Sequence, residues 1–172
     1  MTRVPLSVLA LAAFLLPATS QALIIPLQAT IDCAQANAGA GTCGAGGEGT
    51  GSATMSLDDT TGQFDWDITW SGLSGTISVA HFHGPARPDK NAGVEVDIGA
   101  ISGLTSPSIG MAILDAEQQA DLLAGLWYIN IHSLPNFGGG EIRGQVVPEP
   151  GSLALVALGT SGLALLGRRR RT

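Results

Sequence analysis

Positively charged residues are scarce in the central part of this 172-residue chain. Between residues 23 and 147 only Arg87, Lys90 and Arg143 are basic, whereas 13 of the 14 acidic residues of the chain lie there. This part therefore carries a net charge of −10. Nucleic acids and anionic lipids attract proteins through clustered Lys and Arg. The charge argues against both as partners and indicates a well-solvated protein.

Signatures of common enzyme classes are missing as well. The sequence contains no catalytic serine motif, no phosphate-binding glycine loop and no zinc-protease helix. The run Gly138-Gly139-Gly140 is expected in a hairpin-like loop rather than between a strand and a helix, so it is no nucleotide signature. We therefore expect a protein that is not an enzyme; a metal-dependent redox activity is the alternative.

The first 22 residues have the order of a secretory signal peptide. Arg3 precedes an apolar run from Val8 to Leu16, and Pro17 and small residues follow up to Ala22. The run is too short for a hydrocarbon core that needs about 20 residues. We predict cleavage after Ala22 and a single domain over residues 23–147, a length that suits one core.

Near the C-terminus, residues 151–167 carry no charge. At about 1.5 Å per residue, a helix of this length is a borderline span of the hydrocarbon layer. The basic residues that follow would stay on the cytoplasmic side, which leaves the main domain outside the inner membrane. We predict a transmembrane helix over 151–167.

Only two cysteines are present, Cys33 and Cys43, in a stretch rich in glycine and alanine. A thiolate metal site would need more ligands at metal-binding spacing. In an exported chain, two such cysteines are expected to form a disulfide that closes a small loop.

Strand signals recur through the central part. In residues 64–70, Phe64, Trp66, Ile68 and Trp70 alternate with polar residues, which is typical of a half-buried antiparallel strand. Other predicted strands cover 23–31, 52–57, 77–83, 94–98, 127–132 and 141–147. Short strands separated by Gly, Pro and Asp turns indicate an all-β sandwich or barrel.

One short helix interrupts the predicted strands. Asp115 and Gln118 fit a capping box, and Gly125 is placed to end the helix.

The C-terminal segment resembles a PEP-CTERM sorting signal of Gram-negative bacteria. It has a motif, an apolar segment and an arginine cluster in that order, formed by Val147, Pro148, Glu149, Pro150, residues 151–167, Arg168, Arg169, Arg170 and Arg171. The resemblance places the signal at residues 148–172. It implies an exosortase as processing partner, a transient membrane anchor, and then a cell-surface or extracellular location in an exopolysaccharide layer. A plain, uncleaved single-pass anchor is the alternative.

The central part resembles a CHRD domain, a module of secreted proteins. Three segments carry the resemblance: HFHGPA at 81–86, WYINIH at 127–132 and GEIRGQ at 140–145. Their motif residues besides the histidines are Gly84, Pro85, Asn130, Glu141, Arg143 and Gly144. The resemblance implies an immunoglobulin-like or superoxide-dismutase-like Greek-key β-sandwich and no settled activity.

The chain contains three histidines, His81, His83 and His132. His81 and His83 are two residues apart in a predicted strand, so their rings are expected on the same side. If His132 joins them, three imidazoles could bind copper(II) or zinc(II) with one open position. The pattern is similar to copper,zinc superoxide dismutase, which implies that Arg143 attracts substrate. A binuclear site is excluded because it needs more histidines.

Two other interpretations stay open. The histidines could be structural, with ring nitrogens bonded to backbone, to Asn130 or to Glu141, and with Arg143 paired to a carboxylate. Alternatively, the region could recognise carbohydrate or protein through exposed aromatic faces. We favour a structural or adhesive surface protein without a cofactor, with exopolysaccharide or other surface proteins as partners; a mononuclear copper or zinc protein is the alternative.

Overall fold

A computed structural model describes residues 22–36 and 48–151 of the chain. Strands dominate it, and their side chains alternate between core and surface. In β3 (Gln63–Ser71), Phe64, Trp66 and Ile68 are buried while Asp67 and Thr69 are exposed, as the sequence pattern predicted. The other strands are β1 (Ile24–Asp32), β2 (Thr50–Asp58), β4 (Thr76–His83), β5 (Val94–Asp97), β6 (Ser108–Ile113), β7 (Tyr128–Leu134), β8 (Phe137–Gln145) and β9 (Val147–Pro148).

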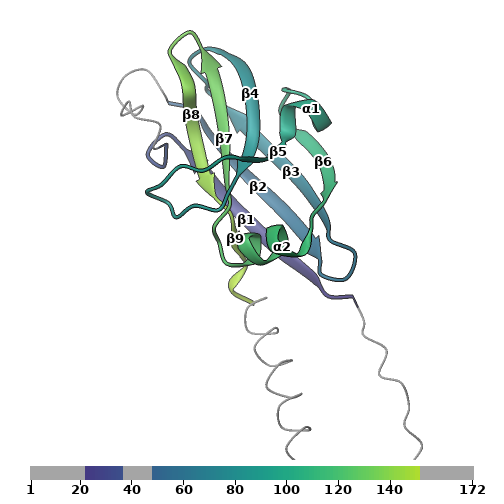
Figure 1. Ribbon diagram of the computed structural model, residues 1–172. Helices are drawn as coiled ribbons and strands as arrows, with labels where there is room; N and C mark the ends of the chain where they lie inside the picture. Colours follow the sequence, from purple (N-terminus) through teal and green to yellow (C-terminus); the bar gives the residue numbers. More distant parts are fainter. Residues whose placement is uncertain (1–21, 37–47, 152–172) are drawn as a thin grey trace, which may run out of the picture.

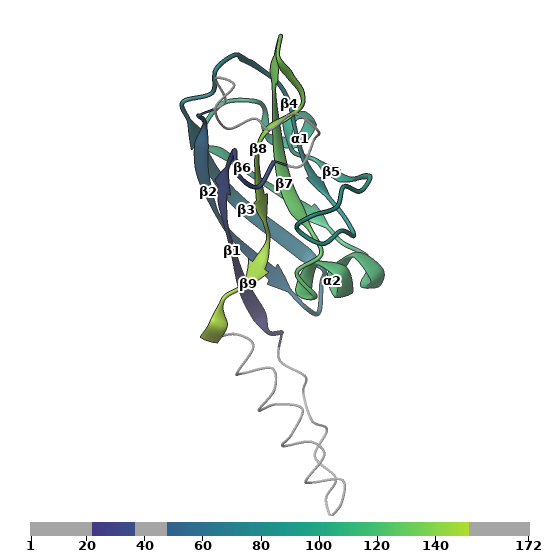
Figure 2. The same cartoon turned by 90° about the vertical axis from the view of Figure 1, so that its left-hand side faces the viewer.

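All described strands belong to one antiparallel sheet. Its order is β5-β4-β7-β8-β1-β2-β3-β6, with β9 paired to β1. The sheet curls until β4, β7 and β8 face β2, β3 and β6 across the core (Figures 1 and 2). The all-β fold class is therefore confirmed as a nearly closed β-sandwich.

Aromatic side chains fill the space between the two halves of the sheet. The Phe64 and Phe82 rings meet edge to face with centroids 5.1 Å apart, and Trp66 packs on Phe82 at 5.4 Å. Trp127 completes this cluster and has no exposed surface. Full burial of each large apolar side chain contributes about 1.5–3 kcal/mol, so this cluster is a main source of stability.

The two described helices are short. Helix α2 (Ala116–Leu123) has the predicted capping box, in which the Asp115 carboxylate accepts from the Gln118 backbone and the Gln118 side chain accepts from the Asp115 backbone. Helix α1 (Ile98–Ser102) was not predicted. The predicted strand over 94–98 instead ends at Asp97, which caps α1 by accepting from the Ala100 backbone N–H.

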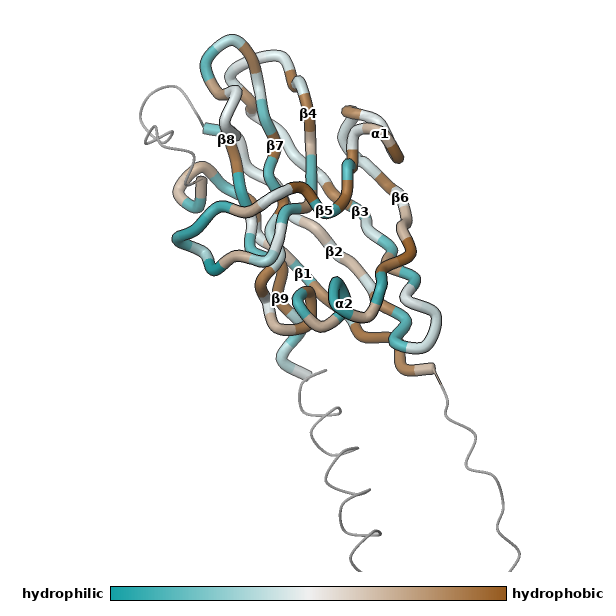
Figure 3. The backbone as a smooth tube through the Cα atoms, in the orientation of Figure 1, coloured by the Kyte–Doolittle hydropathy of each residue, from teal (hydrophilic) through white to brown (hydrophobic). Residues whose placement is uncertain are grey.

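Strand β6 was not predicted either, because its outward positions are apolar rather than polar. Ile109 and Ile113 are 65% and 63% exposed, and hydrophobic positions recur along β6 in Figure 3. The expected loop at Gly138-Gly139-Gly140 is wrong as well, since these residues continue β8, which begins at Phe137.

Several predictions fall on other parts of the chain. The signal peptide up to residue 21, Cys43 and residues 152–172 lie outside the described residues. Within residues 22–36 and 48–151, no helix is long and apolar enough to cross a membrane. The disulfide and the transmembrane helix therefore stay predictions.

Both ends of the described chain lie at one pole of the molecule. The start of β1 and the end of β9 both lie at the lower end of the domain in both views (Figures 1 and 2). Their pairing fixes this arrangement, since Gln28 faces Val147 and Leu27 faces Pro148.

Candidate metal centre

The three histidines lie together on the outer face of the sheet. His81 and His83 alternate along β4 with Ala80 and Phe82, which belong to the core, so both imidazoles point away from it. His132 lies on the neighbouring strand β7. The His81 ring centroid is 5.4 Å from that of His83 and 5.7 Å from that of His132. The predicted pairing of His81 and His83 on one side is thus found, and β7 supplies the third ring.

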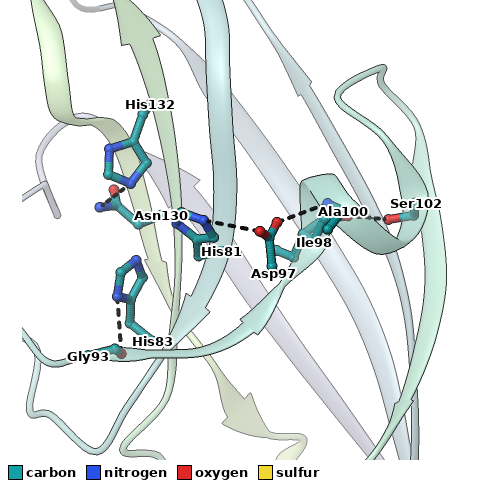
Figure 4. A network of polar contacts seen from close by, with 9 residues as sticks. All are labelled: His81, His83, Gly93, Asp97, Ile98, Ala100, Ser102, Asn130 and His132. Atoms are coloured by element: carbon teal, nitrogen blue, oxygen red, sulfur yellow. Dashed lines mark hydrogen bonds and ion pairs between the residues drawn. The ribbon is translucent and has the colours of Figure 1, made fainter.

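Ring nitrogens of these histidines converge on one point. One nitrogen from each ring lies within 4.8 Å of those from the other two. Figure 4 shows the three rings close together, with contacts from His81 to Asp97, from His83 to Gly93 and from His132 to Asn130. The contacts of each ring decide which nitrogen is left to bind a ligand.

Backbone carbonyls fix the tautomers of His83 and His132. His83 Nδ1 lies 3.1 Å from the carbonyl oxygens of Ala92 and Gly93, and His132 Nδ1 lies 2.9 Å from that of Gly138. A carbonyl only accepts, so each Nδ1 carries the hydrogen and each Nε2 keeps its lone pair. His83 Nε2 is buried without a hydrogen-bond partner in the described chain.

A carboxylate lies near the third ring. His81 Nε2 lies 3.9 Å from Asp97 Oδ2, while His81 Nδ1 is buried without a hydrogen-bond partner in the part that the structure describes. This distance is too long for a hydrogen bond, so the carboxylate acts on the ring through electrostatic attraction, which favours the proton on Nε2 and the lone pair on Nδ1. The inner ring nitrogens are therefore His81 Nδ1, His83 Nε2 and His132 Nε2; the last accepts from the Asn130 amide at 3.2 Å, a bond that a metal ion would replace.

Burial keeps two of the imidazoles neutral. The pKa of His83 is lowered mainly by loss of solvation, and repulsion from His81 and His132 lowers it further, against the raising effect of the Ala92 carbonyl. The pKa of His132 is lowered for the same main reason, with His81 adding to it. Neutral imidazole is the form that binds metal, so little proton release opposes binding at neutral pH.

A second layer of side chains holds His83. The Tyr128 ring stacks on it, with centroids 5.0 Å apart and planes 7° from parallel, and the Tyr128 hydroxyl accepts from the Ala92 N–H at 3.1 Å. Arg143 lies over the same Tyr128 ring, 3.4 Å from its centroid. This stack connects β4, β7 and β8 with the loop that supplies the carbonyls of Ala92 and Gly93.

Arg143 also holds that loop, which is mostly hydrophilic in Figure 3. Its guanidinium donates to the Lys90 carbonyl at 2.9 Å, to Asn91 Oδ1 at 3.0 Å and to the Arg87 carbonyl at 3.3 Å. The side chain is only 2% exposed. Arg143 thus acts on the histidines through Tyr128 and the loop rather than by displaying its charge beside them.

Comparison with known proteins gives two family matches. The CHRD domain family matches residues 27–146, which is more than half of the chain. The chain belongs to the CHRD family. A PEP-CTERM protein-sorting motif matches residues 146–171, so this CHRD protein is exported and sorted by an exosortase in a Gram-negative bacterium. Neither a curated protein nor a solved structure matches the chain.

The structure explains other motif residues of this CHRD domain by packing. A Cβ on Gly84 would lie 2.5 Å from Trp127 Cδ1, and one on Gly144 would lie 2.6 Å from the Thr30 carbonyl oxygen, so only glycine fits. Asn130 donates to the Gly139 carbonyl and to His132 Nε2, both at 3.2 Å, so the expected bond between a histidine and Asn130 is found.

Glu141 is not part of the histidine cluster. Its carboxylate accepts from the Ser74 backbone N–H at 2.7 Å and from the Ser133 hydroxyl, which ties the β3–β4 loop to β7. The expected pairing of a histidine or of Arg143 with Glu141 is therefore not found: Glu141 accepts from the two serines, and Arg143 donates to loop oxygens.

Most aromatic residues that could have formed an exposed stacking face lie inside, as the alternation of residues 64–70 predicted for Trp66 and Trp70. Trp66, Trp127 and Tyr128 are buried, and Trp70 is partly buried. Asp97 and the carbonyls of Ala92, Gly93 and Gly138, which surround the histidines, were not predicted from the sequence. Among the groups around the histidines, Tyr128 could have been predicted, because alternate residues of a strand share a face and Tyr128 alternates with Asn130 and His132.

Proposed function

We propose that this CHRD domain is a metal-binding protein of the cell surface. It binds one copper(II) or zinc(II) ion through His81, His83 and His132. The observation that carries the proposal is the convergence of three imidazole nitrogens, two of them buried and without a hydrogen-bond partner in the described chain.

The chemistry of the ligand set supports these two metals. Imidazole nitrogen suits zinc and copper, whereas magnesium and calcium prefer oxygen ligands. Zinc–nitrogen bonds are about 2.0–2.1 Å long, so small ring rotations must bring the three nitrogens closer together. Three protein ligands leave a further position for water or another donor.

A purely structural cluster explains less of the geometry. Hydrogen bonds to Ala92, Gly93 and Gly138 account for one nitrogen of His83 and one of His132, and the Asn130 amide accounts for the other nitrogen of His132. They leave His83 Nε2 and His81 Nδ1 without donors, and a buried unsatisfied polar atom costs about 1–3 kcal/mol. A bound cation removes this cost by accepting the lone pairs.

At the level of the cell, we propose a structural or adhesive role in an exopolysaccharide layer. The sorting motif and the acidic central domain support a solvated protein of that layer. An exopolysaccharide or another surface protein is the partner. Deletion of the encoding gene should weaken cell aggregation, and full aggregation in the deletion strain would contradict this role.

Metal content tests the site directly. The full chain, exported from a bacterial host and dialysed, should retain about one copper or zinc ion, measured by inductively coupled plasma mass spectrometry. A His81→Ala/His83→Ala variant should lose it, because one ligand cannot hold the ion alone. Thr69→Ala, an exposed change on β3, is the control and should keep the metal. Equal metal content in all three proteins, including none, would reject the site.

A further inference from the structure

The folded domain holds the start of the sorting motif, residues Val147–Glu149. Strand β9 consists of Val147 and Pro148 and pairs with β1. The next residue continues the contact, since the Glu149 N–H donates to the Pro26 carbonyl at 3.1 Å. Glu149 and Pro148 are each only partly exposed.

The residue before the motif is fixed even more firmly. Val146 is fully buried, and its N–H donates to the Trp127 carbonyl at 2.9 Å. The core therefore ends directly at the motif, and the described chain offers no spacer between them.

We propose that release of β9 from β1 precedes cleavage by the exosortase. Proteins that bind an extended segment commonly do so along its backbone, by adding it to a strand of their own. In the folded domain, the backbone groups on one side of β9 already pair with β1 and are not open to the exosortase. The competent substrate is therefore the form in which Val147–Glu149 has left Pro26–Gln28.

This order predicts a measurable effect on rate. When only a fraction of a protein is in the competent form, its apparent affinity falls by that fraction. A two-residue strand with few hydrogen bonds opens easily, so freeing it should speed processing by about tenfold rather than by many orders of magnitude.

A cross-strand disulfide is the sharpest test. Gln28 and Val147 are direct partners with exposed side chains, and antiparallel partners have the Cα separation that a disulfide needs. Gln28→Cys/Val147→Cys in the full chain should block conversion to the shorter form in membranes with the exosortase, followed by gel electrophoresis. Reductant should restore it.

Two controls distinguish the effect of the cross-strand disulfide from the effects of the cysteine substitutions themselves. Val147→Cys alone tests the change beside the motif, and Ser52→Cys/Thr69→Cys places a cross-strand pair on β2 and β3, away from it. Both should be processed like the parent chain.

An insertion tests the converse. Four Gly-Ser residues between Val146 and Val147 should free the motif and speed processing by about tenfold. Unchanged processing of the locked, oxidised chain would overturn the proposal. So would an insertion variant that is processed no faster than the parent.

Discussion

Arg143 is a buried cation whose acceptors in the structure are neutral oxygens. It donates to the carbonyls of Arg87 and Lys90 and to the side chains of Asn91 and Gln145. Loss of solvation lowers its pKa from the ordinary value, but a guanidinium stays charged in proteins. Its planar fork can hold several loop oxygens while its face covers Tyr128, which a lysine ammonium cannot do.

We expect Arg143→Lys to weaken metal binding without removing a ligand. The 84–93 loop and the Tyr128 stack should loosen, so that His83 loses its fixed orientation. Changes in outer partners of metal ligands typically cost 10–100-fold in affinity. Competition with a chelator would measure this, and the electron paramagnetic resonance spectrum of bound copper(II) should broaden.

Arg87→Lys is the matched control, because Arg87 is exposed and contributes to Arg143 only through its backbone carbonyl. Its affinity should equal that of the parent. Equal affinities for both variants would show that Arg143 does not position His83.

At the scale of elements, the end of β4 depends on a residue without a side chain. Gly84 follows His83 and packs against the fully buried Trp127, whose ring cannot move without disturbing the aromatic cluster. Added volume at such a place forces shifts of backbone or side chains.

Gly84→Ala should therefore lower the free energy of unfolding by about 1–3 kcal/mol. Gly93→Ala, in the same loop region, is the control, because nothing lies within 4 Å of a Cβ built there. Chemical denaturation midpoints of both variants would be compared with the parent. A midpoint for Gly84→Ala equal to that of Gly93→Ala would contradict the packing argument.

Elements with a complete local pattern were predictable from the sequence. Phe64–Trp70 alternates, Asp115 and Gln118 are spaced for a capping box, and His81 and His83 are spaced to share a strand face. Elements set by the tertiary structure were not. β6 has no polar face to reveal it, and α1 has only five residues, too few for a helical period.

The histidine cluster was predictable only in part, for the same reason. Two of its members lie on one strand, but His132 joins them only through the pairing of β4 with β7. The groups that orient the rings are mostly backbone carbonyls. Every residue has a carbonyl, so the sequence does not reveal which ones bond to the histidines.

For the whole molecule, the buried histidines make the metal-free domain sensitive to acid. The folded-state pKa values of His83 and His132 lie below the ordinary value of about 6.5. Below that pH the unfolded chain therefore binds more protons than the folded one, so stability is lost as pH falls. Asp58 and Asp89 add little to this change in stability between pH 7 and 5. Hydrogen bonds from Thr61 and Lys90 lower their pKa values, so both carboxylates stay ionised over this range.

We expect the melting temperature of the metal-free protein to fall between pH 7.5 and pH 5, as followed by circular dichroism. A His83→Gln/His132→Gln variant should lose most of this dependence, because glutamine does not titrate. The same slope in the variant and the parent would show that other groups set the acid sensitivity.

The shared pole of β1 and β9 also bears on how such a domain can be combined with others. Because the first and last strands of the domain pair with each other, the domain could replace a surface loop of an unrelated host without pulling the ends of that loop apart. A domain of this kind can be inserted, duplicated or exchanged as one unit, together with its three histidines.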